Sequence, residues 1–332
     1  IFPSQYENEV IRLTNLIVSL SAVFGIGKIG KELFNKNVGK ITFLIFFFYP
    51  IFFGHMAINS KDTIIAFCHV WIFYLFLKYL RKQNISKKTN KYIFYIALLT
   101  AIATGQQLLF VGSLGVIILF ILIEIFLVKK IVSNFFSTKI FIYDLIKCFI
   151  IFYLILILFW IDVHENILIN PFSNIKLMFS ENFWTGWSYN LLNGQYYISY
   201  DVPAYYFLIN FFYKSPEYIL ISYIIFFILF LNSKNFYKNK FKFFNYKLFL
   251  IISMLIFPNL ILLFIPFPVY DGMRLFLWTL PYFFIIPALS IYYLIENFNY
   301  IKPKFTLLLL SFLFIYYLFN FFSITPYQYT YL

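Results

Sequence analysis

The densest group of reactive side chains lies between residues 49 and 63, where His55, Asn59, Lys61 and Asp62 fall between two apolar segments. We take Asp62, Lys61 and His55 as candidate catalytic residues and Asn59 as a candidate substrate ligand. A structural role is equally open, because a carboxylate is favoured at a helix N-terminus. Asp62 would then simply cap the following helix, with Lys61 as its counter-ion.

A second group, in residues 268–274, contains Tyr270, Asp271 and Arg274. Arg274 falls at the edge of an apolar segment, where a cation is costly unless it is paired or binds an anion. Asp271, three residues earlier, could be its partner. Alternatively, the planar guanidinium is suited to binding a phosphate, with Tyr270 beside it.

A third group combines aromatic rings, amides and a carboxylate in residues 184–206, with Asn193, Gln195 and Asp201 as its polar members. Such side chains can bind sugars, and we take these three, with Asp271, as candidate substrate ligands. The same residue types also occur in any loop at a membrane interface.

The composition places all these groups in a membrane protein. Only 12% of the 332 residues are charged and the mean hydropathy is +0.83, whereas soluble domains carry about 25% charged residues. About 20 apolar residues cross a bilayer as a helix. We predict a single all-α transmembrane bundle of about ten spans, at residues 10–27, 40–56, 63–80, 92–105, 107–128, 140–161, 217–232, 248–267, 275–295 and 305–323.

Positive charge alternates between the predicted connections. Of 26 Lys and Arg, 21 fall in the connections after every odd-numbered span, and the other five are Arg12, Lys61, Lys176, Lys214 and Arg274. Because basic loops stay cytoplasmic, all three groups should face outward. The basic residues lie between apolar segments, which argues against a nucleic-acid partner. Cys68 and Cys148 lie within apolar segments, which indicates neither disulfides nor a zinc site.

Residues 162–216 form one long outer connection. Residues 167–183 and 202–213 suit helices lying in the membrane interface; a re-entrant segment packed between spans is the alternative. A split between two spans at Gly105 is favoured because one span fewer would move basic loops to the outer side. The Gly25-Ile26-Gly27-Lys28-Ile29-Gly30 sequence matches a dinucleotide fingerprint but follows no strand, so we expect it to serve close helix packing.

The three groups resemble the GT-C glycosyltransferases, in the branch of dolichyl-phosphate-mannose-protein mannosyltransferases, lipid A aminoarabinose transferases and RgtA/B/C/D-like transferases. The resemblance rests on Pro-x-x-Phe-Gly-His-x-x-x-Asn-x-Lys-Asp at 50–62, Asn-Gly-Gln-Tyr-Tyr with Asp-x-Pro-x-Tyr-Tyr at 193–206, Tyr-Asp-Gly-x-Arg at 270–274 and Pro-Tyr-Gln-Tyr-Thr-Tyr at 326–331.

The resemblance implies inverting transfer of a sugar from a polyprenyl-phosphate donor to a glycan, lipid or protein acceptor on the outer face of a bacterial inner membrane. It implies that Arg274 lies near the carrier phosphate and that Asp62 lies in the active site, in some relatives near a divalent metal. The family's main base belongs to an outer loop after an initial span, which we expect to be missing here. The chain would then be a fragment, truncated also at its C-terminus, and whether it is active alone is left open.

One departure from the family is the turn at Gly105-Gln106-Gln107, where relatives often place an arginine. A multi-pass transporter or flippase of lipid-linked glycans is the alternative function, since it would also be a basic-inside bundle. Such proteins usually contain repeated halves and ionisable residues at the bilayer midplane. We find no internal repeat, and the polar groups gather at the outer rim. A polymerase or ligase of surface glycans is a third possibility, chemically close to the glycosyltransferase.

Overall fold

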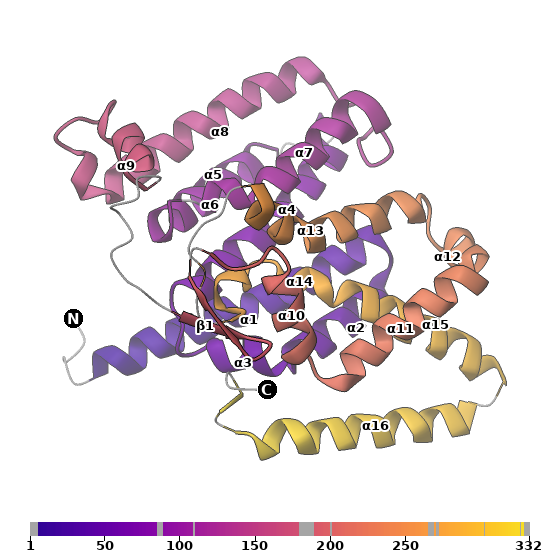
Figure 1. The fold of residues 1–332 in the computed structure, drawn as a ribbon. Helices are drawn as coiled ribbons and strands as arrows, with labels where there is room; N and C mark the ends of the chain where they lie inside the picture. The colour runs from indigo at the N-terminus through magenta and orange to yellow at the C-terminus, as the bar shows by residue number, and fades with distance from the viewer. Residues whose placement is uncertain are drawn as a thin grey trace.

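The protein is a helical bundle with one small β-hairpin, as a computed structural model of the chain shows (Figure 1). The structure describes residues 6–84, 89–108, 110–178, 189–199, 201–264, 269, 272–301, 303–325 and 327–328. Helix accounts for 78% and strand for 3% of the chain, which confirms the all-α prediction.

All the described secondary-structure elements in the first half of the chain are helices. They are α1 (Glu7–Leu33), α2 (Lys36–Phe47), α3 (Pro50–His55), α4 (Asp62–Lys82), α5 (Thr89–Gln106), α6 (Phe110–Ser113), α7 (Gly115–Ile123), the π-helical turn η2 (Glu124–Val128), α8 (Thr138–Phe159), the 3-10 turn η3 (Ile161–Val163) and α9 (Asn170–Met178).

The second half begins with the hairpin and returns to helices. Its elements are β1 (Tyr189–Leu192), β2 (Gln195–Ile198), α10 (Tyr206–Tyr213), α11 (Glu217–Asn232), α12 (Lys234–Lys240), α13 (Phe244–Phe264), the 3-10 turn η5 (Arg274–Phe276), α14 (Leu280–Phe283), α15 (Ile285–Ile301) and α16 (Pro303–Ser323). The antiparallel register pairs Tyr189 with Ile198 and Leu192 with Gln195.

Within the part of the chain that the structure describes, six helical segments are long and apolar enough to cross a membrane, which makes this an integral membrane protein. They are Glu7–Leu33, Asp62–Lys82, Phe110–Val128, Thr138–Phe159, Phe244–Phe264 and Leu280–Asn297. A seventh is obtained if α10 and α11, which are bent by 113°, form one broken span. The other predicted spans correspond to α2 with α3, α5, α11 and α16, and none of these meets both criteria alone over the described residues. A total of about ten stays a prediction.

The predicted split at Gly105 is present, because α5 ends at Gln106 and α6 begins at Phe110. Two helices also occur in the connection 162–216, where helices lying in the membrane interface were predicted. The helix α9 falls within residues 167–183, and α10 falls within residues 202–213. The 113° bend means that α10 does not continue the direction of α11.

The basic connections gather at one end of the bundle, which we call the base-rich end. Glu32 on α1 pairs with Lys78 and Arg81 on α4, and Ser133 donates its backbone N–H to the carbonyl of Leu80. At the same end Lys240 on α12 pairs with a carboxylate of α15. In Figure 1 this end lies to the right, while α9 and the hairpin lie toward the left. The alternation of charge along the sequence therefore corresponds to two ends of the fold.

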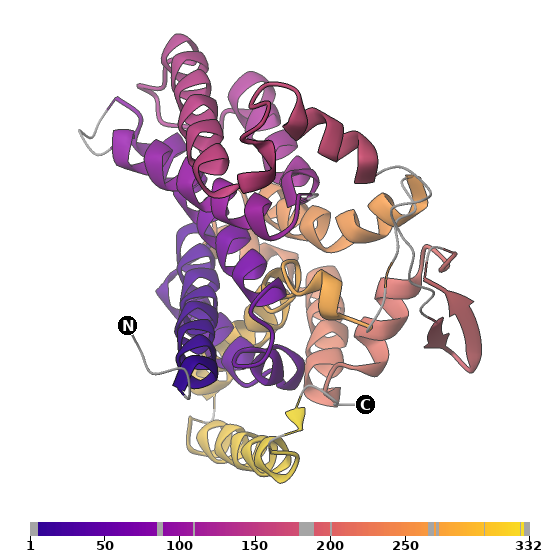
Figure 2. The same cartoon turned by 90° about the vertical axis from the view of Figure 1, so that its left-hand side faces the viewer.

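Large apolar side chains are exposed along the outside of the bundle. On α8, for example, Tyr143, Leu154 and Phe159 are 67%, 63% and 77% exposed. The helices α8 and α16 form opposite outer edges of the molecule in Figures 1 and 2. Because water disfavours contiguous apolar surface of this extent, these faces suit contact with lipid.

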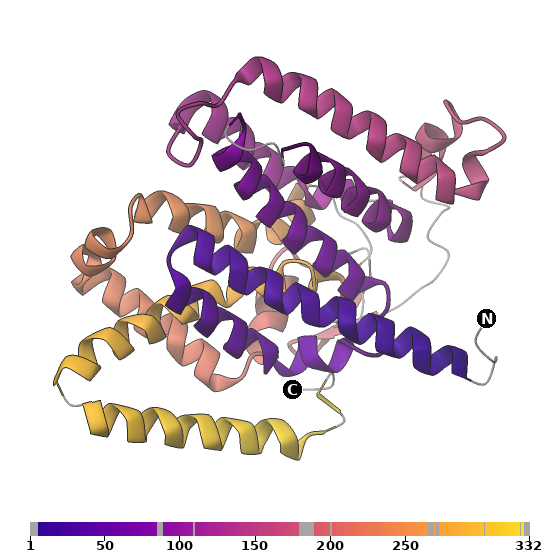
Figure 3. The ribbon, with the colours of Figure 1, turned by 180° about the vertical axis from the view of Figure 1, so that it is seen from behind.

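Small residues let α1 and α2 pack closely, as seen from behind in Figure 3. A Cβ atom added at Gly39 would meet the carbonyl oxygen of Gly27 and would lie 2.9 Å from the backbone nitrogen of Lys31. All three glycines of the 25–30 segment lie inside α1. The segment is therefore a helix-packing surface and not a nucleotide loop, as predicted.

Replacing Gly39 by alanine is expected to destabilise the bundle, because backbone atoms of α1 leave no room for a methyl group. The cost should be about 1–3 kcal/mol, typical of overpacking, and visible as a lower melting temperature of the detergent-solubilised protein. Gly105→Ala is the matched control, since no atom outside its own helix lies within 4 Å of a Cβ at that position. An equal drop in both variants would contradict the packing explanation.

Candidate functional site

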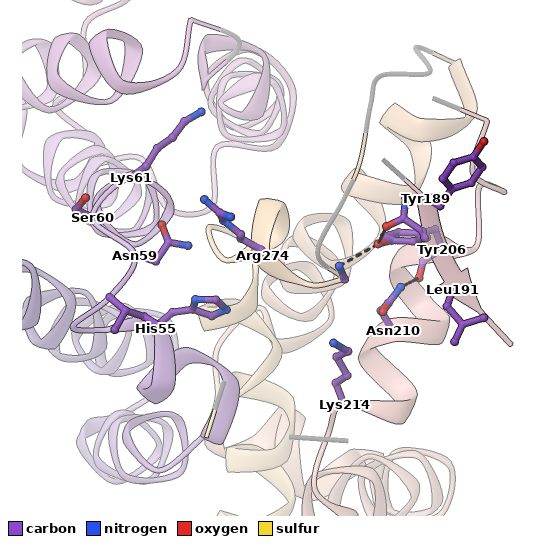
Figure 4. A pocket seen from close by; sticks show the side chains of 13 residues that line it. His55, Asn59, Ser60, Lys61, Tyr189, Leu191, Tyr206, Asn210, Lys214 and Arg274 are labelled. Atoms are coloured by element: carbon purple, nitrogen blue, oxygen red, sulfur yellow. Dashed lines mark hydrogen bonds between the residues drawn. The ribbon is translucent and has the colours of Figure 1, made fainter. Parts of the chain in front are cut away.

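The end opposite the base-rich end contains a cavity of about 860 Å³ (Figure 4). We call it the rim cavity. Its lining residues come from three separate parts of the chain: His55, Ile58, Asn59, Ser60 and Lys61; Tyr189, Asn190, Leu191, Tyr206, Asn210 and Lys214; Gly272 and Arg274. In Figure 4 the first set forms one wall, the hairpin with α10 forms the other, and Arg274 lies between them.

Asn59 shapes the first wall by capping α4. Its side-chain oxygen accepts the backbone N–H of Asp62 at 3.0 Å, and its amide nitrogen donates to the Asp62 carboxylate at 2.9 Å. Both residues are buried. Thr63 donates to the Asn15 side chain at 2.8 Å, which fastens this turn to α1. Capping satisfies an orphan amide of the helix and fixes the turn that presents Lys61 and His55 to the cavity.

The Asp62 carboxylate pairs with Arg274 and not with Lys61. The Arg274 Nε atom donates to Asp62 Oδ2 at 2.9 Å across 212 positions of sequence. The carboxylate side chain is 5% exposed and the arginine side chain 36%. The capping explanation is therefore corrected in both parts: the cap is the Asn59 side chain, and the counter-ion is Arg274. Arg274 also lines the rim cavity.

The second wall is joined to the Arg274 loop by a buried polar network. The Tyr206 hydroxyl donates to Asn190 Oδ1 at 2.9 Å and accepts the Gly272 N–H at 3.0 Å. The Asn190 side chain in turn donates to the carbonyl of Val269 at 2.7 Å. Tyr206 is 1% and Asn190 6% exposed. The hairpin, α10 and the approach to Arg274 are thereby held as one unit.

Gly272 brings this unit close to a lysine that the sequence analysis did not single out. Its φ of +62° lies in the left-handed region, and an added Cβ would lie 2.9 Å from Lys214 Nζ and 3.2 Å from Asn210 Oδ1. The carbonyl of Lys214 also accepts the Tyr49 hydroxyl at 3.3 Å. Glycine is therefore required where Lys214 approaches the Arg274 loop.

Gly272→Ala is expected to displace the Lys214 side chain and to weaken any anion bound in the rim cavity by about tenfold, a loss of about 1.4 kcal/mol. Tyr206→Phe, which removes one hydroxyl from the same network without changing its shape, should weaken binding less. Titration with a polyprenyl phosphate measures both. Gly194→Ala is the control, because Gly194 also has a positive φ, of +80°, but has nothing within 4 Å. The assignment fails if Gly194→Ala weakens binding as strongly.

Cations dominate the described lining of the rim cavity. Three of the five Lys and Arg residues predicted for this end of the chain, Lys61, Lys214 and Arg274, line this one space. The Asp62 carboxylate, which contacts Arg274, also accepts from Asn59. Among the described residues, no lining side chain is acidic. Such a cavity favours an anion over a cation.

Three predicted substrate ligands lie away from the rim cavity. Asn193 and Gly194 form the hairpin turn with φ of +52° and +80°, and the Asn193 side chain accepts the Tyr213 hydroxyl at 3.3 Å. Gln195 accepts from Tyr197 at 2.8 Å, and Asp201 is exposed. None of the three lines the cavity, so their role as substrate ligands stays a prediction. Tyr270 and Asp271 lie outside the described residues, as do Trp184, Thr185, Gly186 and Trp187.

The residues present do not fit a divalent metal at Asp62. No three His, Cys, Asp or Glu side chains among the described residues are placed to hold a metal. The Asp62 carboxylate is already paired with the Arg274 guanidinium, which would repel Mg²⁺ or Mn²⁺.

Several polar residues of the site were not foreseen. They are Asn15, Asn190, Asn210 and Lys214, whereas Tyr206 belongs to the third predicted group. The Asn193-Gly194 pair is the usual signal of a two-residue hairpin turn and would have predicted β1 and β2, and with them the position of Asn190. Asn15 carried no such signal, since it is a single amide inside an apolar helix.

Comparisons with known proteins do not place the chain in a family. No family model matches it, and neither a curated protein nor a solved structure shows similarity to it. The functional interpretation therefore rests on the rim cavity and on the sequence motifs that form it.

Proposed function

We propose that this protein is a membrane glycosyltransferase of the GT-C type that transfers a sugar from a polyprenyl-phosphate donor to an acceptor at the rim cavity. The observation that carries the proposal is the gathering of Lys61, Lys214 and Arg274 around one 860 Å³ space at the end that is otherwise poor in Lys and Arg. A sugar linked to a polyprenyl phosphate combines an anionic headgroup with an apolar tail. Its phosphate would lie at the membrane surface, where the rim cavity is proposed to open.

The reaction would be a displacement at the anomeric carbon. The acceptor oxygen forms a bond to that carbon while the bond to the carrier phosphate oxygen breaks, and the acceptor proton leaves to a base. The departing phosphate gains negative charge, so cations fixed in advance lower the barrier. Arg274 and Lys214 take this role, with Tyr270 assigned beside them by its sequence position. We assign His55 and Lys61, on the opposite wall, to the acceptor side.

Asp62 acts in this scheme as a positioning residue. It is buried, holds Arg274 by an ion pair and is held in turn by Asn59. The main base is not assigned to any described residue. The proposal places the base-rich end in the cytoplasm and the rim cavity outside, in a bacterial inner membrane with about ten spans, following the preference of basic loops for the cytoplasmic side.

A transporter or flippase would use ionisable groups within its spans. The described spans contain the buried charged residues Asp62, Glu124, Asp144 and Lys247 and the buried His69. His69, on α4, has partners at both ring nitrogens. They lie 2.8 Å from the Tyr282 hydroxyl and 3.2 Å from the Ser113 carbonyl. This histidine joins three segments of the bundle, which favours a structural role and therefore the enzyme.

Binding of polyprenyl phosphate to the full chain in nanodiscs tests the proposal. The Lys61→Ala/Lys214→Ala double variant should bind at least about tenfold more weakly. The matched control is Arg12→Ala/Lys176→Ala, which removes two charges from the same predicted side at exposed positions outside the rim cavity. If both double variants bound polyprenyl phosphate equally weakly, the effect would come from general surface charge, and the rim cavity would be rejected as the binding site.

Transfer itself is measured with a panel of polyprenyl-phosphate sugars and membrane extracts as acceptors, with release of free polyprenyl phosphate as the readout. Release that depends on both acceptor and donor supports a transferase. Movement of the intact donor across the bilayer without release would instead support the flippase.

A further inference from the structure

A second cavity, of about 230 Å³, lies at the base-rich end. It is lined by Lys130, Lys238, Phe241, Phe243, Phe244, Asn245 and Tyr246. These residues come from the connection after η2, from α12 and from the beginning of α13. We call it the basal cavity. It shares no residue with the rim cavity, so its interpretation is independent of the proposed function.

The two lysines of the basal cavity have no counter-ion among the described residues. The chain has four acidic residues at this end, and none forms an ion pair with either lysine. Glu32 pairs with Lys78 and Arg81, Asp144 accepts from the Tyr79 hydroxyl, and Glu296 pairs with Lys240. Glu124 accepts the backbone N–H groups of Ile131 and Val132 and lies beside Tyr246 of the cavity wall. The positive charge of Lys130 and Lys238 is therefore left for a ligand or solvent to balance.

Aromatic rings fix the position of one of these cations. Lys130 Nζ lies 5.4 Å from the ring centroid of Phe243 and 5.7 Å from that of Tyr246, within the range of cation–π attraction. Phe243 adopts a φ of +56°, which is uncommon for a bulky residue. This backbone conformation places the ring beside the lysine at the mouth of the cavity.

The helix α13 contributes a third source of positive potential. Its first three residues, Phe244, Asn245 and Tyr246, form part of the cavity wall. The N–H groups of a first helical turn have no acceptor within the helix, and the helix dipole adds a partial positive charge there. A first helical turn and two lysines that line one small space form a recurrent arrangement for binding phosphate.

We propose that the basal cavity binds a phosphate group at the membrane surface. The apolar helix α13 runs from the cavity into the bilayer, and Phe243 is 47% exposed at its mouth. An anionic phospholipid would place its phosphate in the cavity and its acyl chains along α13. A soluble phosphate ester carries the same recognised group, and the experiment separates the two sources.

The test compares two double variants of the full chain that lose the same charge from the same end. Lys130→Ala/Lys238→Ala removes both cavity lysines, and Lys234→Ala/Lys242→Ala removes two that do not line it. Each protein is incubated with phosphatidic acid in micelles of a non-ionic, phosphate-free detergent, and bound lipid is counted by native mass spectrometry. The cavity double should retain about tenfold less phosphatidic acid than the control double, because general attraction to the surface is equal in both.

The soluble source is tested by adding inorganic phosphate, against chloride at equal ionic strength, in micelles without phosphatidic acid. A rise in melting temperature that the cavity double loses and the control double keeps would identify a soluble phosphate ligand. Selective loss of phosphatidic acid would identify the lipid. If the two doubles behave alike with both probes, the basal cavity is not a phosphate site and the proposal is overturned.

Discussion

Arg274→Ala is expected to reduce sugar transfer by about 10²–10³-fold, the loss seen when one preorganised stabiliser of transition-state charge is removed. Arg274 is the lining cation whose position is fixed by an ion pair, at 2.9 Å from Asp62. The rate of polyprenyl phosphate release is the readout. Arg274→Lys should recover part of the activity, since it keeps the charge but loses the planar group that can bind two oxygens.

The same variant leaves a buried carboxylate without its partner, so stability must be measured beside activity. Removing one member of a fully buried pair costs about 3–5 kcal/mol. The cost here should be smaller, because the arginine side chain is 36% exposed and water screens the pair. Arg12→Ala serves as the folding control. Unchanged transfer in a correctly folded Arg274→Ala protein would show that the phosphate role is wrong.

Substitution of Asp62 is expected to have the second largest effect, and it separates positioning from base catalysis. Asp62→Ala removes the acceptor of both Arg274 and Asn59, so Arg274 is no longer held and turnover should fall by about 10²-fold. Binding of polyprenyl phosphate should be retained or tightened, because the cavity loses its nearest negative charge.

Asp62→Asn gives the decisive comparison. An amide oxygen can still accept the hydrogen bond from Arg274 Nε, so a positioning role predicts substantially more turnover than in Asp62→Ala. A carboxamide cannot accept a proton at neutral pH, so a base role predicts that the two variants are equally inactive. The turnover of Asp62→Asn relative to that of Asp62→Ala, measured on proteins that both bind polyprenyl phosphate, therefore decides the role of Asp62.

The membrane class, the all-α fold and the alternation of charge could be predicted because each depends on properties summed over many residues. Twenty apolar positions define a span even when several are misjudged. The span boundaries are less certain because α2, α5 and α11, at 12, 18 and 16 residues, are near or below the length that crosses a bilayer. There the sequence pattern does not separate a tilted span from a partly inserted helix.

The site was predicted in part, for a different physical reason. Local sequence identified His55, Asn59, Lys61 and Asp62 together, because neighbours in one turn are neighbours in space. It did not identify Asp62 as the partner of Arg274, because that pairing depends on how α4 and η5 pack. The nearer Asp271 was the only partner that spacing could suggest. Lys214 was overlooked as a site residue because nothing local distinguishes it from any surface lysine.

The Asp62–Arg274 pair also has a consequence for how the protein is made. The two residues are separated by 212 positions, and ribosomes add about 5–20 residues per second. Asp62 therefore enters the membrane region about 10–40 seconds before its partner is synthesised. The ion pair that joins α4 to η5 can therefore form only after most of the bundle has been synthesised, so it completes the rim cavity late in biosynthesis and cannot guide the insertion of α4.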